Sequence, residues 1–176
     1  MTSECSRPKN KGMLLSRLFL WCALLAAPSL RADDVSLIRV GERWRFWSGT
    51  APGEFWRETD FDDSSWQEGR SGFSSSNDEA TAAYSSTNQA ILFRKQFVVA
   101  NPAAVKWLVL RLDFSSGFVA YLNGTEIARA NLAGDLVPVD ARATRSRARG
   151  VAQDINVSGF APLLNSGTNV LAIQLH

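Results

Sequence analysis

Residues 117–131 read GFVAYLNGTEIARAN, and this stretch says most about the fold. Two short runs that suit β-strands, Phe118–Leu122 and Thr125–Ala130, flank Asn123 and Gly124. A two-residue turn of type I′ needs positive φ at both central positions, and Asn-Gly is a pair that tolerates it well. The stretch therefore predicts a β-hairpin with Asn123 and Gly124 at its tip.

A two-residue turn also predicts the register of this hairpin. Counting back from the turn pairs Leu122 with Thr125, Ala120 with Ile127, and Phe118 with Arg129. Directly opposed residues share a face, so Arg129 is expected beside Phe118 at the margin of an apolar face. A charged group there needs a partner, and Asp113 is the nearest candidate in sequence. A structural ion pair and a ligand-facing arginine assisted by Asn131 both remain open.

Alternating or apolar runs elsewhere predict further strands at 36–40, 43–47, 91–99, 106–114 and 168–175. In 106–114, the leucines at 108, 110 and 112 would share one face with Phe114. Residues 157–164 are expected to form no more than a short helical turn. The polar stretch 48–90 contains many large rings, which predicts ordered loops pinned to the core. Four of the tryptophans, Trp44, Trp56, Trp66 and Trp107, are expected in the core.

The first 32 residues have the pattern of a secretory signal peptide. A basic segment precedes the apolar run LFLWCALLA at 18–26, and a cleavage site follows after Ala32. A membrane anchor is the alternative, but the uncharged run from 18 to 30 is 13 residues long, and a spanning helix needs about 20. We therefore expect a signal peptide at 1–32 and one domain at 33–176. The domain would be secreted or held in the cell envelope, with no membrane span after cleavage.

Charge and cysteine content change once this leader is set aside. It holds five of the 19 Lys and Arg residues and one of the 17 Asp and Glu residues, which leaves 14 basic against 16 acidic residues. The apparent basicity belongs to the leader, so nothing favours nucleic-acid binding. Cys5 and Cys22 also lie in the leader. The remaining chain therefore has no disulfide, thiol nucleophile or Cys-ligated metal.

Residues suited to catalysis are scarce. The only histidine, His176, is the last residue, and the sequence has no GxSxG, HExxH or phosphate-loop motif. We therefore expect a non-catalytic protein. Asp62 and Asp63 in TDFDDSSW, residues 59–66, are candidate calcium ligands, because hard cations take several oxygen ligands. A turn whose carboxylates accept backbone N–H groups is the favoured alternative. No other cofactor is expected, and a structural calcium ion remains open.

The order of several motifs is familiar: RWRFWSGTAPGEFW at 43–56, FDDSSWQEGRSGF at 61–73, ILFRKQFVV at 91–99, the hairpin at 117–131 and GTNVLAIQLH at 167–176. This order resembles the galactose-binding-like modules of secreted bacterial proteins, which accompany lamin-tail, phosphoesterase or glycoside hydrolase domains. The FDDSSW element also resembles the sugar-binding domain of some β-glycosidases. The resemblance covers residues 42–176 and implies an all-β jelly-roll β-sandwich.

Two departures from the family pattern affect what the resemblance implies. The family has an acidic pair where this chain has Ser115 and Ser116. Relatives also continue beyond the position of His176 into a further strand. The resemblance therefore implies a jelly roll that lacks its last strand, with an unpaired sheet edge there.

The expected function is non-catalytic binding of an extracellular carbohydrate or similar polar ligand. The alternative is an accessory, interaction or spacer module of a larger secreted hydrolase, which would add further domains of a longer parent chain. The expected ligand-binding residues lie near loop ends: Trp47, Tyr121, Asn123, Arg129 and Asn131. Trp47 breaks the alternation of its strand, so its ring is expected to be exposed, and sugar rings pack well on such surfaces.

Overall fold

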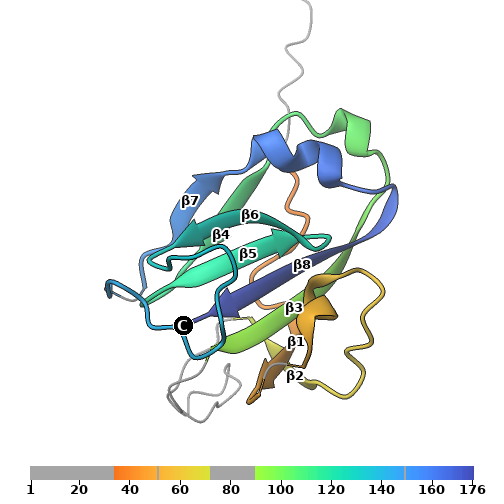
Figure 1. Cartoon of the computed structure of the whole chain (residues 1–176). Coiled ribbons are helices and arrows are strands. Elements are labelled where there is room, and N and C mark those ends of the chain that lie inside the picture. The colour runs from red at the N-terminus through yellow and green to blue at the C-terminus, as the bar shows by residue number, and fades with distance from the viewer. Residues whose placement is uncertain (1–33, 51, 72–89, 149) are drawn as a thin grey trace, which may run out of the picture. The chain divides into compact units, whose positions relative to one another are not determined.

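The computed structural model describes residues 34–50, 52–71, 90–148 and 150–176 (Figure 1). In these residues nearly all regular structure is β. The strands are β1 (Arg43–Ser48), β2 (Gln67–Arg70), β3 (Ile91–Val99), β4 (Val109–Leu112), β5 (Phe118–Leu122), β6 (Thr125–Ala130), β7 (Gln153–Asn156) and β8 (Gly167–Leu175). Three short 3₁₀ helices join them: η1 (Glu54–Arg57), η2 (Pro102–Ala104) and η3 (Ser158–Leu163). The expected all-β sandwich is confirmed. In the described residues, no helix has the length and apolar composition of a membrane-spanning segment.

Two antiparallel sheets form the sandwich. The larger one has six strands in the order β2-β1-β3-β8-β5-β6, and the smaller one pairs β4 with β7. β8 lies inside the large sheet, where it pairs with β3 on one side and β5 on the other (Figure 1). The unpaired edge expected at the C-terminal strand is therefore not at β8. Among the described strands, β2 and β6 form the edges of the large sheet.

The main core lies between the two sheets. Alternate residues of the large sheet point to this side, among them Phe93, Phe118 and Ile173, and the small sheet contributes Leu110. The rings of Phe114 and Phe118 pack edge to face with centroids 4.6 Å apart. The face predicted for 106–114 is confirmed, although the strand itself is only four residues long.

Residues 36–40 form no strand, so that prediction is wrong; Leu37 and Ile38 still pack against the core.

A second apolar cluster covers the other face of the large sheet. It joins side chains of β3, β5 and β8 to rings and aliphatic groups from segments 56–66 and 132–143. Trp56 and Trp66 are 5% and 4% exposed and stack with centroids 6.2 Å apart. Within the described part of 48–90, this confirms that large rings pin the loops, although Phe55 is 72% exposed. Gln67–Arg70 form strand β2 instead of a loop, so the prediction is wrong there, and residues 72–89 with Phe73 and Tyr84 lie outside the described residues. The middle of the large sheet is therefore covered on both faces.

The predicted hairpin is present, but its register shifts. Asn123 and Gly124 have φ of 50° and 86°, as a type I′ turn requires, and Leu122 opposes Thr125. Farther from the turn Tyr121 opposes Glu126, Ala120 opposes Ala128, Val119 opposes Arg129 and Phe118 opposes Ala130. Ile127 is the extra residue of a β-bulge, and its side chain joins the main core. The expected pairs of Ala120 with Ile127 and Phe118 with Arg129 are wrong. Because of the bulge, Arg129 lies on the opposite face of the sheet, beside Val119.

Candidate functional site

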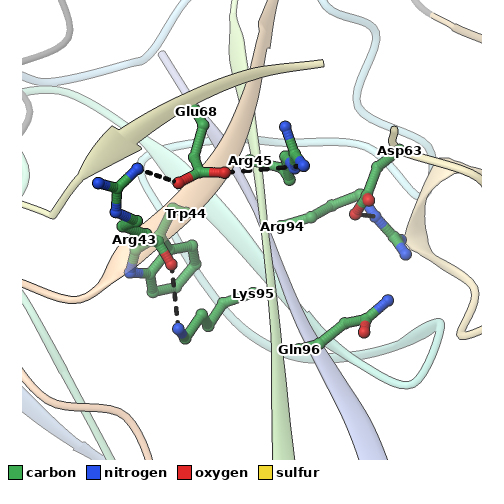
Figure 2. Close-up of a pocket in the computed structure, with 8 residues that line it drawn as sticks. All are labelled: Arg43, Trp44, Arg45, Asp63, Glu68, Arg94, Lys95 and Gln96. Carbon is green, nitrogen blue, oxygen red and sulfur yellow. Dashed lines mark hydrogen bonds and ion pairs between the residues drawn. The ribbon is translucent and has the colours of Figure 1, made fainter. Parts of the chain in front are cut away.

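A pocket opens where β1 and β3 part. The two strands pair only between Arg45↔Arg94 and Ser48↔Ile91. Before Arg45, β1 stays paired with β2, while β3 continues along β8 to Val99. The pocket at this divergence has a volume of about 410 Å³. Figure 2 shows its lining residues, which are Arg43, Trp44, Arg45, Asp63, Glu68, Arg94, Lys95 and Gln96. We call it the β1–β3 pocket.

Two arginines on one side of the pocket share a single carboxylate. Arg45 and Glu68 are opposed across β1 and β2, and Arg43 lies two residues away on the same face. Nη1 of Arg43 lies 2.6 Å from Oε1 of Glu68, and Nη2 of Arg45 lies 3.6 Å from Oε2 (Figure 2). Nη1 of Arg45 also donates to the carbonyl of Trp66 at 3.2 Å. The hydrogen bond from Arg43 holds the pKa of Glu68 below its ordinary value, so this carboxylate stays ionised.

Lys95 braces the start of β1 from the side of β3. Its Nζ lies 2.7 Å from a carboxylate oxygen of Glu42 and donates to the carbonyl of Arg43 at 3.0 Å. The side chain is 17% exposed. The hydrogen bond from Lys95 is the main cause that lowers the pKa of Glu42. Lys95 thereby holds the backbone that carries Arg43.

Arg94 is the most deeply buried of the pocket's cations, with no exposed side-chain area. Its Nε lies 2.8 Å from Oδ2 of Asp63. The guanidinium also donates to the carbonyls of Trp56, Glu58 and Phe61 and lies over the ring of Phe61. All its donor nitrogens are therefore used to hold segment 56–63 against the sheet. Arg94 is therefore a fixed wall of the pocket.

The two candidate calcium ligands have separate roles in the structure. Oδ1 of Asp62 accepts a hydrogen bond from the backbone N–H of Ser64 at 2.9 Å, and contacts with Ser64 lower the pKa of Asp62. This is the turn arrangement favoured from the sequence. Asp63 instead pairs with Arg94. Among the described residues, no three His, Cys, Asp or Glu side chains come together in a way that could hold a metal ion. Calcium binding at Asp62 and Asp63 stays a prediction.

Two of the expected ligand-binding residues belong to the second apolar cluster. Tyr121 is buried inside it, and Trp47 packs against it. Tyr121 is 4% exposed, its ring meets that of Trp56 edge to face, and the guanidinium of Arg57 covers it at 4.7 Å. Burial raises the pKa of the Tyr121 hydroxyl. Trp47 is half-buried, and its Nε1 donates to the carbonyl of Thr50 at 2.9 Å. The expectation of an exposed ring at Trp47 is wrong.

Asn123 and Asn131, two other expected ligand residues, use their side chains within the fold. Nδ2 of Asn123 donates to the carbonyl of Leu163 and to Oδ1 of Asn169, both at 2.8 Å. Its Oδ1 accepts from the N–H of Val170 at 2.8 Å. Nδ2 of Asn131 donates to the carbonyl of Ser116 at 2.6 Å. Both asparagines have positive φ, and each side chain ties together segments that are distant in the sequence.

Arg129, the remaining expected ligand residue, forms a two-pronged ion pair with Glu126. Its Nε and Nη2 each lie 2.5 Å from a Glu126 oxygen, and Nη1 donates to the carbonyl of Gly134. The expected pairing with Asp113 is wrong, since Oδ2 of Asp113 accepts from the N–H of Gly150 at 2.8 Å. Of the five expected ligand residues, none lines the β1–β3 pocket. Their role in binding stays a prediction.

Neither the β1–β3 pocket nor the exposed ring of Trp107 is predicted from the sequence. Arg43 and Arg45 are visible as the polar half of an alternating strand, but nothing local in the sequence indicates that Glu68 lies opposite them. Trp107 was expected in the core and is 67% exposed. It follows the alternation of Val109 and Arg111, which also face outward from the small sheet. The alternation itself could have identified Trp107, since its neighbour Leu108 packs inward.

Comparisons with known proteins show the fold. No family model matches the sequence, and no curated protein sequence matches it. Among solved structures, Bacteroides uniformis β-glucuronidase 2, bound covalently to cyclophellitol-6-carboxylate aziridine, has a TM-score of 0.51 and 18% identity, over 79% of this chain and 14% of that chain. A β-glycosidase from Bacteroides vulgatus has a TM-score of 0.51 and 14% identity, over 78% of this chain and 16% of its own. A glycosyl hydrolase family 2 member from Bacteroides cellulosilyticus has a TM-score of 0.51 and 13% identity, over 77% and 17%.

The comparisons therefore agree with the observed β-sandwich fold. At these identities the likeness is one of fold alone. The chain matches a small part, 14% to 17%, of the length of these three glycosidase chains.

Proposed function

We propose that this chain is a non-catalytic carbohydrate-binding module that accompanies a glycoside hydrolase outside the cell. The observation that carries the proposal is the β1–β3 pocket, a concave surface with many hydrogen-bond donors. Its two carboxylates, at Asp63 and Glu68, are both held in ion pairs with arginines. Such a site suits recognition of a polar ligand better than proton transfer, which needs a carboxyl group free to gain and lose a proton.

The fold and the sequence support the same context. The three solved chains described above share the β-sandwich and are glycosidases, and the matched part is a small fraction of each. A module of this kind would leave catalysis to another domain of a longer chain. The signal-peptide pattern of residues 1–32 adds that the module works in the extracellular space or the cell envelope.

The test is binding of the purified protein to a panel of neutral and acidic polysaccharides by affinity electrophoresis and calorimetry. The key variant is Arg43→Gln combined with Arg45→Gln, which removes both guanidiniums from the pocket. We expect at least one glycan to bind the native protein and to bind this variant about tenfold more weakly or worse.

The matched control is Arg111→Gln. Arg111 is an exposed arginine of β4 that does not line the pocket, and its side chain is 71% exposed. This control should bind as the native protein does. Absence of binding to every plant, algal and bacterial polysaccharide in the panel would refute the proposal.

A second candidate function, docking onto a neighbouring domain, is favoured by the outer face of the small sheet. Trp107 and Val109 there are 67% and 42% exposed, and exposed apolar groups of this size often mark an interface. The test is to read the coding DNA beyond the codon of His176 and to express any longer chain. Stronger hydrogen-exchange protection of residues 107–112 in the longer chain supports docking; unchanged protection argues against it.

A further inference from the structure

We infer that the β1–β3 pocket recognises an oxyanion substituent of its glycan, either the carboxylate of a uronic acid or a sulfate ester. This inference rests on the proposed function and names the class of ligand. It begins with charge. Four cationic side chains line the pocket, and the three carboxylates paired with them are Glu42, Asp63 and Glu68. One positive charge is therefore in excess, although residues 33–176 as a whole carry about two negative charges in excess. A concave wall concentrates such a local field.

The excess charge falls on Arg43 and Arg45. These two guanidiniums share Glu68, and the 3.6 Å contact of Arg45 is long for an ion pair. Each guanidinium has five N–H donors. The contacts seen in the described part of the chain use Nη1 of Arg43 and Nη1 and Nη2 of Arg45. The pair therefore keeps donors for a ligand, and an oxyanion can take two of them at once.

The surrounding contacts hold these arginines ready. Lys95 fixes the backbone at Arg43, and strand pairing with β2 fixes both positions on one face. Arg94 forms a rigid, fully buried wall nearby. The side chains of Arg43 and Arg45 are 69% and 38% exposed, so a ligand can reach both. Figure 2 shows the two guanidiniums on either side of the Glu68 carboxylate.

Glu68 then acts as an internal competitor for the ligand. Its carboxylate occupies the position between the two guanidiniums that a ligand oxyanion would take. Glu68→Gln keeps the shape of this side chain and removes its charge. An oxyanion ligand should bind this variant more tightly, because it no longer displaces a carboxylate. A neutral sugar has no such competition to escape and should bind no better.

The experiment compares charged and neutral forms of the same polymer by calorimetry at low and at high salt. The probes are polygalacturonate against its fully methyl-esterified form, and dextran sulfate against dextran. We expect the charged member of at least one pair to bind about tenfold more tightly than its neutral counterpart, with added salt weakening it. Preference for polygalacturonate identifies a carboxylate, and preference for dextran sulfate identifies a sulfate ester.

Glu68→Gln and Asp154→Asn each remove one negative charge, the first inside the pocket and the second outside it, so comparing them separates a local effect from general attraction. Glu68→Gln should tighten binding of the charged probe about threefold or more, while Arg45→Gln should weaken it about tenfold. Asp154→Asn is the control, because Asp154 is exposed on β7, away from the pocket lining. It should leave binding unchanged. Melting temperatures of all variants verify that they are folded.

Three outcomes overturn the inference, and they differ in what they do to the proposed function. Equal binding of charged and neutral polymers through the pocket rejects the oxyanion and leaves the binding module standing. Equal tightening by Glu68→Gln and Asp154→Asn means that general charge, and not the pocket, attracts the probe. No binding of any glycan removes the inference together with the proposed function.

Discussion

At the scale of single residues, Arg94 carries a charge in a fully buried position. A buried guanidinium is tolerated only when it is paired and its donors are satisfied. Asp63 supplies the opposite charge, and three carbonyls of segment 56–63 accept the other donors. Arg94 therefore ties a long loop to the centre of the large sheet, and its role is structural.

We predict that Arg94→Met destabilises the protein by about 3–5 kcal/mol, because it leaves Asp63 and several carbonyls without their donor. The measurement is the free energy of unfolding from urea denaturation. Arg111→Met is the control: Arg111 is highly exposed, with only a 3.6 Å ion pair, and should cost no more than about 0.5 kcal/mol. Equal losses for the two variants would contradict a structural role for Arg94.

His176 is a second residue with a clear physical consequence. Its ring is half-buried, with Nδ1 2.8 Å from the carbonyl of Ala141 and Nε2 3.0 Å from Nε2 of Gln174. Burial lowers the pKa of His176 below its ordinary value of 6.5. In the unfolded chain the imidazole gains a proton as the pH falls through about 6.5, whereas the folded protein gains it only at lower pH. The unfolded state binds more protons in this window, so the free energy of unfolding decreases as the pH is lowered.

We therefore predict that the free energy of unfolding decreases between about pH 7 and pH 5, and that His176→Gln removes most of this dependence. Urea denaturation at several pH values in this range measures it. The carboxyl groups of Glu42, Asp62 and Glu68 have lowered pKa values and ordinary values of 4.5 or less, so their contribution to stability is lost only at lower pH. Parallel pH profiles for the native protein and the variant would rule out this role of His176.

At the scale of elements, the β5–β6 hairpin combines a tight turn with a bulge. The turn is local, since Asn123 and Gly124 both have positive φ. The bulge at Ile127 has a tertiary cause, because it lets that side chain join the main core while Glu126 and Arg129 pair on the other face. A Cβ at Gly124 would lie 2.3 Å from the carboxylate of Glu58, so the tip of the hairpin lies against the segment that follows η1.

We predict that Gly124→Ala destabilises the protein by about 1–2 kcal/mol, because a Cβ is unfavourable at φ of 86°. The end of the Glu58 side chain can move away, so the backbone accounts for most of the loss. Thermal unfolding followed by circular dichroism measures the effect. Gly159→Ala is the matched control, since no atom lies within 4 Å of its added Cβ and no positive φ is required. A stable Gly124→Ala variant would mean that the turn is not of this type.

At the scale of the whole domain, the middle of the large sheet is covered on both faces. Val170 and Ile173 show this on one strand: Ile173 faces the small sheet, and Val170 faces the loop cluster with Trp56 and Trp66. Val170 is fully buried and Ile173 is 6% exposed. The loops of segments 56–66 and 132–143 therefore act as a third layer, with an apolar interior of its own.

We predict that Ile173→Ala costs about 2–5 kcal/mol and Val170→Ala about 1–3 kcal/mol, because each leaves a cavity in a packed layer. Val98→Ala, at a position 70% exposed on β3, should change stability by no more than about 0.5 kcal/mol. Urea denaturation of the three variants gives the comparison. Tolerance of Val170→Ala would mean that the loop layer adds little to stability.

The strand faces and the Asn-Gly turn could be read from the sequence, because they depend on local periodicity. Alternation with period two places Leu108, Leu110 and Phe114 on one face whatever lies opposite, and a turn with two positive φ values selects Asn-Gly wherever it occurs. The all-β class followed from these features alone.

The partners of the charged side chains depended on tertiary structure. A shift of one residue at Ile127 moved Arg129 to the opposite face, since a one-residue slip inverts every side chain beyond it. Glu68 meets Arg43 and Arg45 only because β2 pairs with β1, and Trp107 is exposed because nothing in the described chain covers the outer face of the small sheet. Local periodicity states which way a side chain points, whereas its partner is set by whichever distant strand or loop packs there.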